Sequence, residues 1–402
     1  MNNGSEIKAA LQKVVDAGQL AGAATLVWHN GEAQTDCVGW RDAEANLPIE
    51  RGTIFRLASM TKPITSVAAL MLVEDGRIAR TDSIARYAPE FSQMRVLRSP
   101  NGPLDETDPV ERPITFEDLL THRAGFTYGD FHRGPIAQAY RDALGGEIDS
   151  DVAPDEWIAR LAQLPLIGQP GSAMYYGCST DLLGLLIARI EGAPLGEVLK
   201  RRIFDPLGMK DTSFLVPREK RARRAAAYGF DEEGRLTKRV ARSGVFVAER
   251  PDEMAYESGG AGLWSTLDDY LSFARLFLGD GNVNGVRLLR AETLAAMMTN
   301  QLTDSQQAHP RWLGLKPGRG FGLGLSVVLE TSKADFMRRG SAGTVSWPGA
   351  FGGWWQADPK DGSVLIFLAH NMVNLAQMGK GIGLGVWGAI EAFQTLASDS
   401  PP

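Results

Sequence analysis

The sequence predicts an α+β protein in which one antiparallel sheet, flanked by helices, is built from both ends of the chain and a mostly helical domain is inserted between them. Length is the first reason, because 402 residues exceed what a single ordinary hydrophobic core holds. The second is that strand patterns occur near both ends, with short helical patterns rich in Pro, Gly and Arg between them. We expect a sheet domain formed by residues 1–85 and 250–402 and a helical domain formed by residues 86–249.

The expected N-terminal elements begin with an amphipathic helix and a hairpin. Asn30-Gly31 lies between two strand-like runs, and this dipeptide is typical of a two-residue hairpin turn. Gly76 follows a run with helical spacing, at the place where a C-terminal cap is expected. The predicted ranges are a helix over 5–20, strands over 22–29, 34–41 and 53–58, and a helix over 61–75.

The later elements follow from the same two periodicities. Residues 358–362, Asp-Pro-Lys-Asp-Gly, form an expected hairpin turn between two apolar strands. Because strand patterns return at the C-terminal end, we expect these strands to join the N-terminal hairpin in one sheet. The predicted helices cover 154–164, 181–191, 267–278, 291–299 and 385–398, and the predicted strands cover 321–329, 344–351, 353–357 and 364–370.

Composition and charge restrict the classes of partner. The chain is 44% hydrophobic and 22% charged, which is typical of a globular protein with enough apolar material to bury an active site. A net charge of −6 argues against nucleic acid or an anionic membrane as the main partner. The apolar runs are too short to span a bilayer, and the first residues lack the pattern of a signal peptide. We therefore expect a cytoplasmic monomer or small homo-oligomer that acts on a small molecule.

The placement of cysteine and histidine argues against a disulfide framework and against a metal centre. Cys37 and Cys178 are far apart in the sequence, and a zinc site needs clustered ligands. The histidines are scattered without metal-ligand spacing. We expect neither a metal nor a cofactor.

The candidate catalytic centre is the sequence Ser59-Met60-Thr61-Lys62. At a spacing of three residues on a helix, the side chains of Ser59 and Lys62 share a face. A serine hydroxyl is a weak nucleophile, and a neighbouring ammonium or amine favours loss of its proton. Pro63 is consistent with the first turn of a helix, whose N-terminal end also stabilises negative charge. The pattern therefore predicts Ser59 as a nucleophile and Lys62 as its partner.

The flanks of this pattern resemble a known superfamily. Residues 55–63, Phe-Arg-Leu-Ala-Ser-Met-Thr-Lys-Pro, are similar to the nucleophile segment of serine β-lactamases and penicillin-binding proteins, and more narrowly to that of the family VIII carboxylesterases. Further similar segments follow in order at 119–126, 203–209, 258–266 and 347–349. The first of these resembles a structural turn of the family, which implies a structural role for His122. The resemblance covers nearly the whole chain. It implies a β-lactamase-like fold and a serine hydrolase that needs no cofactor.

The resemblance also implies the catalytic base. Pro170-Gly171 with Tyr176, followed by residues 181–184, Asp-Leu-Leu-Gly, is similar to the tyrosine segment of the family. Tyr175 is the immediate rival of Tyr176. A phenolate held near an ammonium can take the Ser59 proton and later return it to the leaving alkoxide. The segment therefore implies that Tyr176 acts on Ser59.

A third similar segment, Trp347-Pro348-Gly349, stands where relatives that cleave β-lactams usually carry Lys-Thr-Gly. The resemblance implies that this strand borders the active site. The backbone N–H of Ala350 would then join that of Ser59 in an oxyanion hole, in which each donor is typically worth a factor of about 100 to 1,000 in rate. Trp347 and Gly349 are therefore expected to contact substrate.

Two departures from the β-lactam-handling relatives favour short-chain carboxylic esters as substrates. Cys178 occupies the position of an asparagine whose amide contacts the substrate, and a thiol is a poor substitute. Trp347 replaces a lysine that would attract a substrate carboxylate. Side chains of the inserted domain are expected to line the entrance, namely Phe126, Tyr128 and Phe131.

Other functions stay open at this point. The same acyl-enzyme chemistry would serve a β-lactamase, a D-amino-acid peptidase or an acyltransferase. A catalytically inactive binding protein would retain the fold without the chemistry. The Gly-x-Ser-x-Gly elbow of α/β-hydrolases is absent at every serine, so a Ser-His-Asp triad on that fold is not supported.

Overall fold

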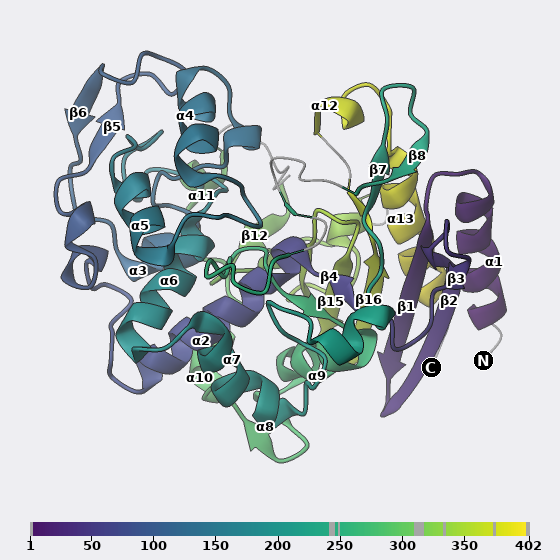
Figure 1. The fold of residues 1–402 in the computed structure, drawn as a ribbon. Helices are drawn as coiled ribbons and strands as arrows, with labels where there is room; N and C mark the ends of the chain where they lie inside the picture. Colours follow the sequence, from purple (N-terminus) through teal and green to yellow (C-terminus); the bar gives the residue numbers. More distant parts are fainter. Residues whose placement is uncertain are drawn as a thin grey trace.

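An antiparallel sheet built from both ends of the chain is the centre of the structure, a computed structural model that describes residues 3–240, 246–247, 250–308, 317–332, 335–372 and 375–398. Within these residues, eight strands pair in the order β12-β13-β14-β15-β16-β1-β2-β3 (Figure 1). The predicted α+β class and the joining of the two chain ends are confirmed. The strands of this sheet are β1 (Gly22–His29), β2 (Glu32–Asp42), β3 (Leu47–Pro48), β12 (Arg319–Phe321), β13 (Ser326–Val328), β14 (Val345–Pro348), β15 (Trp354–Asp358) and β16 (Ser363–Ala369).

The first hairpin follows from its turn residues. Asn30 and Gly31 have φ angles of 51° and 89°, the left-handed conformation that a tight turn between twisted strands requires. Asparagine and glycine adopt this conformation at a lower cost than other residues. His29 therefore pairs with Glu32, and this pair sets the register of β1 against β2. The predicted hairpin is confirmed.

The two faces of the sheet pack against different helices. On one face, Trp354 belongs to a core shared with α1 (Asn3–Asp16) and α13 (Leu384–Ser398). Its neighbour Trp355 belongs to the core of the opposite face, which packs against α9 (Leu267–Ala274). Successive side chains of a strand point to opposite faces, so an unbroken apolar strand such as β16 can serve both cores.

The helices between residues 116 and 207, here called the helical part of the chain, lie beside the sheet. The helix α2 (Thr61–Glu74) runs between this helical part and the sheet (Figure 1). The side chains from Thr61 to Leu70 are all buried, so α2 is a core helix rather than a surface helix. Among the residues that the structure describes, no helix is both long and apolar enough to cross a membrane. The division of the chain at residues 86 and 249 stays a prediction.

The shorter elements connect these layers. The remaining helices are α3 (Phe116–Leu120), α4 (Pro135–Leu144), α5 (Pro154–Ala162), α6 (Ser179–Glu191), α7 (Leu195–Leu199), α8 (Asp205–Leu207), α10 (Ala291–Met297), α11 (Asp304–Ala308) and α12 (Leu375–Met378). The remaining strands are β4 (Phe55–Arg56), β5 (Arg95–Leu97), β6 (Thr107–Pro109), β7 (Tyr228–Phe230), β8 (Leu236–Lys238), β9 (Trp264–Ser265), β10 (Asn282–Val283), β11 (Val286–Arg287) and β17 (Asn371–Met372).

The prediction of one continuous strand over residues 321–329 is wrong. The chain turns within this range, and Phe321 at the end of β12 pairs with Ser326 at the start of β13. The turn closes because Gly322 donates its backbone N–H to Leu325 O at 2.8 Å, and Gly324 has a φ of 90° that favours glycine. The apolar residues around these glycines resembled an uninterrupted strand.

Candidate active site

The chain makes a strained turn immediately before Ser59. Ala58 has a φ of 45°, in the left-handed region that is unfavourable for a residue with a Cβ. The following turn is held because Tyr270 donates its hydroxyl hydrogen to Met60 O at 3.0 Å. Ser59 lies half-buried between the buried residues Ala58 and Met60, directly before α2 begins.

Lys62, one helical turn later, is a fully buried lysine whose ammonium has fixed partners. Its Nζ donates to Ser59 Oγ at 3.3 Å, to Tyr128 OH at 3.1 Å and to Gly260 O at 2.8 Å. A buried ammonium is tolerated where its donors are satisfied. The predicted spacing therefore brings Ser59 and Lys62 into contact, and the remaining donors of Lys62 fix its position.

Tyr176, carried by the loop before α6, contacts Ser59 from another direction. Its hydroxyl donates a 2.7 Å hydrogen bond to Ser59 Oγ, and Trp347 Nε1 donates to the same phenolic oxygen at 3.3 Å. Lys62 Nζ lies 4.7 Å from the centre of the Tyr176 ring. The ring of Tyr175 instead packs against Gly168, where a Cβ would lie 2.5 Å from the Tyr175 hydroxyl. Of the two tyrosines left open by the sequence, Tyr176 is the one beside Ser59.

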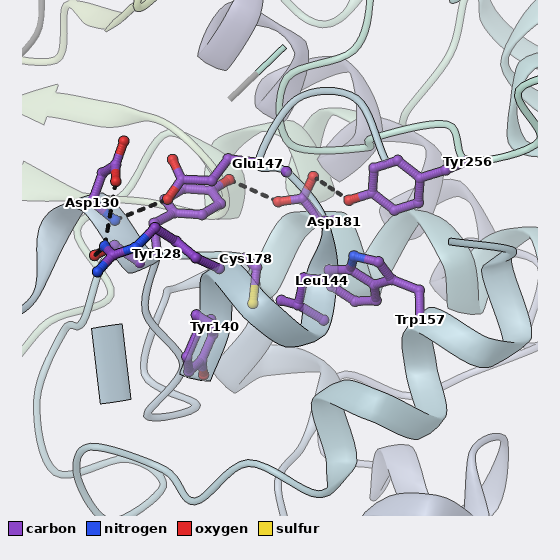
Figure 2. A pocket seen from close by; sticks show the side chains of 13 residues that line it. Tyr128, Asp130, Tyr140, Leu144, Glu147, Trp157, Cys178, Asp181 and Tyr256 are labelled. Carbon is purple, nitrogen blue, oxygen red and sulfur yellow. Dashed lines mark hydrogen bonds and ion pairs between the residues drawn. The ribbon is translucent and has the colours of Figure 1, made fainter. Parts of the chain in front are cut away.

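Asp181, on the first turn of α6, is a buried carboxylate behind Lys62. It accepts a 2.7 Å hydrogen bond from Tyr128 OH and one of 3.1 Å from the backbone N–H of Gly260, and the hydroxyls of Ser258 and Tyr256 also donate to it. Figure 2 shows Tyr128 and Tyr256 approaching the carboxylate from opposite sides. Burial, followed by the nearby charge of Asp181, raises the pKa of Tyr128 well above 10, so this phenol stays protonated as a donor.

The end of β14 lies against the turn that carries Ser59. A Cβ on Gly349 would lie 2.3 Å from Leu57 O, so only glycine permits this approach. Gly349 is also paired within its own turn, where its N–H donates to Gly353 O at 2.7 Å. The predicted oxyanion donor Ala350 follows directly and is exposed.

The predicted pocket residues have different locations. Phe131 stacks on Tyr176 with ring centres 5.6 Å apart, and Trp347 is buried beside the same ring. Phe126 is fully buried against Phe91, with ring centres 5.9 Å apart, so its side chain belongs to the core and not to an entrance. That expectation for Phe126 fails because a ring at this position completes the packing of the helical part.

Cys178 is buried and lines a cavity of about 200 Å³ that Tyr128 and Asp181 also line, and its contact with substrate stays a prediction. Its sulfur points into the space bordered by Tyr140 and Leu144 (Figure 2). Burial raises the pKa of the Cys178 thiol well above its ordinary value, so it stays neutral. At the rim of the same cavity, burial raises the pKa of Glu147 to about 7.

Sequence reasoning overlooked part of the site. Asp181 and Gly260 lay within segments that resembled the superfamily, but neither residue was singled out, and Tyr128 was expected only as a pocket wall. The resemblance implies only a structural role for His122, yet its ring centre lies 4.7 Å from that of Tyr176. The available signal was the presence of a carboxylate and a histidine inside those segments.

Known proteins are similar to this chain over nearly its whole length. An uncharacterized protein of Mycobacterium tuberculosis is 44% identical over 92% of this chain and 90% of that protein. Esterase EstB of Burkholderia gladioli is 30% identical over 91% of this chain and 90% of EstB. The solved structure of EstCE1, a hydrolase with promiscuous acyltransferase activity, has a TM-score of 0.76 at 25% identity and covers 97% of this chain and 98% of its own. Residues 7–381 match the Beta-lactamase family model, and the chain belongs to that family as a serine hydrolase of the β-lactamase and penicillin-binding-protein superfamily, related to the family VIII carboxylesterases.

Proposed function

We propose that this chain is a carboxylesterase that hydrolyses short-chain carboxylic esters through an acyl-enzyme on Ser59. The observation that carries the proposal is the placement of Ser59 Oγ, 2.7 Å from Tyr176 OH and 3.3 Å from Lys62 Nζ. A nucleophile in contact with a base, itself oriented by further groups, is the general arrangement for covalent catalysis. No metal or cofactor takes part in the proposed reaction.

In the first step, Tyr176 acts as a phenolate and takes the Ser59 proton as Ser59 Oγ forms a bond to the ester carbonyl carbon. The Lys62 ammonium and the Trp347 N–H are favourable neighbours for negative charge on the Tyr176 oxygen. The backbone N–H groups of Ser59 and Ala350 bind the oxyanion of the tetrahedral intermediate. The intermediate collapses when the bond to the alkoxide breaks, and the proton on Tyr176 passes to that leaving oxygen.

In the second step, water attacks the acyl-enzyme carbonyl and gives a proton to Tyr176. A second tetrahedral intermediate forms, and its collapse releases the carboxylic acid while Ser59 Oγ recovers the proton from Tyr176. The same base therefore serves both half-reactions, which is consistent with its contact to Ser59.

The environment of Trp347 supports neutral esters over anionic β-lactams. Trp347 is buried, and its indole N–H is directed to Tyr176 rather than to a substrate carboxylate. It stands where many relatives carry a lysine, so the strand offers an aromatic surface in place of a cation. Cys178 offers no side-chain amide to a substrate, because its side chain ends in a thiol.

Intact-mass measurement after treatment with a fluorophosphonate tests the nucleophile. We expect one covalent adduct on the parent protein and none on Ser59→Ala. The matched control is Ser92→Ala, which removes an exposed serine away from this turn and should label like the parent. An adduct that survives Ser59→Ala would contradict the assignment, and no adduct on the parent would favour an inactive binding protein.

Substrate class is tested by comparing kcat/KM for p-nitrophenyl butyrate and nitrocefin. We expect the ester to be the better substrate. Faster turnover of nitrocefin would make a β-lactamase the better description.

Acyl transfer is a second candidate function. It is favoured by the similarity to EstCE1, a hydrolase with promiscuous acyltransferase activity. In this reaction an alcohol replaces water in the second step and gives its proton to Tyr176 in the same way. Added acceptor alcohol that diverts the acyl product from free acid to a new ester would support transfer, and an unchanged yield of acid would support hydrolysis.

A further inference from the structure

His122 is a fully buried histidine directly behind Tyr176, and the proposed mechanism does not use it. Its backbone has a φ of 54°, an uncommon conformation for a residue other than glycine. In this conformation, His122 O accepts a 2.7 Å hydrogen bond from the backbone N–H of Tyr175. The backbone of His122 therefore anchors the residue that precedes Tyr176.

The side chain of His122 anchors the residue that follows Tyr176. Its Nδ1 accepts a 3.4 Å hydrogen bond from the backbone N–H of Gly177, and Thr180 Oγ1 lies 3.4 Å from its Nε2. The imidazole ring also packs against the Tyr176 ring, with centres 4.7 Å apart and planes inclined by 41°. One residue thus contacts Tyr176 and both of its chain neighbours.

The protonation state of His122 agrees with this role. Burial, with a smaller contribution from the charge of Lys62, lowers the pKa of His122 well below its ordinary value of 6.5, so the imidazole is neutral. Because Nδ1 accepts from Gly177, the ring hydrogen of a neutral imidazole is on Nε2, which donates to Thr180 Oγ1. A charged imidazolium could not accept at Nδ1.

The opposite side of the loop leaves little room for adjustment. A Cβ on Gly177 would lie 2.4 Å from Thr127 Cα, so this glycine is in direct contact with the neighbouring backbone. Phe131 stacks on the ring of Tyr176 at 5.6 Å. The loop is therefore packed between His122 and these groups.

We infer that His122 is a positioning residue for the catalytic base, holding the Tyr176 hydroxyl at its 2.7 Å distance from Ser59 Oγ. The inference rests on the proposed function, because it needs Tyr176 to act on Ser59. In this role, His122 does not touch the reacting atoms. It restricts the Tyr175–Gly177 backbone and the Tyr176 ring, and a misplacement of about 1 Å can cost about 100-fold in rate.

A double-mutant cycle with p-nitrophenyl butyrate tests the inference. The variants are His122→Ala, Tyr176→Phe and the double variant, with Ile187→Ala as a control that removes buried side-chain volume from α6. We expect His122→Ala to lower kcat about 100-fold with KM changed less than about threefold. In the Tyr176→Phe background, the same change should lower the residual kcat less than about twofold, because the group being positioned is already gone.

His122→Asn keeps the experiment decisive if His122→Ala does not fold. Asparagine tolerates the left-handed conformation, and its Oδ1 can accept from Gly177 in place of Nδ1. It should recover part of the lost kcat. His122→Phe keeps a ring against Tyr176 but lacks the acceptor, so it should recover less.

The outcomes distinguish a failure of the proposed role of Tyr176 from a failure of the positioning role of His122. If Tyr176→Phe retains the parent kcat, the proposed function of Tyr176 fails. If Tyr176→Phe is impaired but His122→Ala lowers kcat by the same factor in both backgrounds, the positioning role is overturned and His122 acts through general stability. An unimpaired His122→Ala, or an Ile187→Ala control with an equal loss of kcat, would also overturn it.

Discussion

Tyr128 donates a 2.7 Å hydrogen bond to the buried carboxylate of Asp181, and the same hydroxyl accepts one of 3.1 Å from Lys62 Nζ. Hydrogen bonds with an ionised partner contribute about 1.5–3 kcal/mol. We expect Tyr128→Phe to lower kcat for p-nitrophenyl butyrate by about 10- to 100-fold, because Lys62 loses a fixed acceptor while the ring volume is kept. KM should change little.

Tyr140→Phe is the matched control for this change, because Tyr140 is a buried tyrosine that lines the cavity beside Tyr128. Its kcat should stay within about threefold of the parent value. An equal loss in both variants would assign the effect to the cavity rather than to the contact with Lys62.

Asp181 is expected to matter for stability as well as activity. It accepts from Tyr128, Ser258 and the Gly260 N–H, and an asparagine there would turn its own N–H groups toward one of these donors. We expect Asp181→Asn to lower the free energy of unfolding by about 3 kcal/mol, as measured by urea denaturation. The exposed change Asp105→Asn should have almost no effect. Equal midpoints for both variants would contradict the role of Asp181 as a buried acceptor.

Gly349→Ala should move the end of β14 away from the turn that carries Ser59. The added Cβ would lie 2.3 Å from Leu57 O, and a backbone oxygen cannot rotate away as a side chain can. We expect kcat to fall by about 100-fold because the displacement moves Ala350 relative to Ser59. At the control position Gly388, in α13, an added Cβ meets no atom of the described residues within 4 Å beyond its chain neighbours and the backbone of its own helix, so Gly388→Ala should be neutral or slightly stabilising. Full activity of Gly349→Ala would argue against Ala350 as an oxyanion donor.

Glu147 should make stability depend on pH. Burial raises its pKa from 4.5 to about 7, so between these values the folded protein keeps a proton that the unfolded chain has lost. Its contribution is fully present below about pH 4.5 and is lost as pH rises through about 7, with an upper limit on the order of 3 kcal/mol. Glu147→Gln, which is neutral at every pH, should therefore gain stability relative to the parent between pH 5 and pH 8.

Thermal unfolding of both proteins across this pH range measures the difference. The exposed change Glu106→Gln serves as the control and should follow the parent curve. Parallel curves for Glu147→Gln and the parent would contradict the raised pKa of Glu147.

Local features of the fold were predictable because they depend on neighbours in sequence. The Asn30-Gly31 turn and the helix that starts beside Lys62 each reflect a backbone preference or a spacing within one element. The prediction of one strand over residues 321–329 failed because the turn at Gly322 to Leu325 lies inside an apolar run, where the local pattern resembles a strand.

The surroundings of individual side chains were less predictable. Phe126 was expected at the entrance to the site but belongs to the core, and Cys178 lines a cavity that Tyr128 and Asp181 also line. An aromatic residue or a thiol carries no sequence signal that distinguishes a pocket wall from a packed interior. Burial depends on which other segments cover the residue, and this is a property of the whole fold.

The sequence by itself determined the elements, the pairing of Ser59 with Lys62 on one helical turn, and the resemblance that pointed to Tyr176. The tertiary structure alone decided which distant groups complete the site: Gly260 O on Lys62, Trp347 on Tyr176, and His122 behind the Tyr176 ring. The physical reason is the separation in sequence between the residues that make contact. Spacing along a helix fixes contacts across a few residues, whereas contacts between remote segments exist only after α2, α6 and β14 have packed into one core.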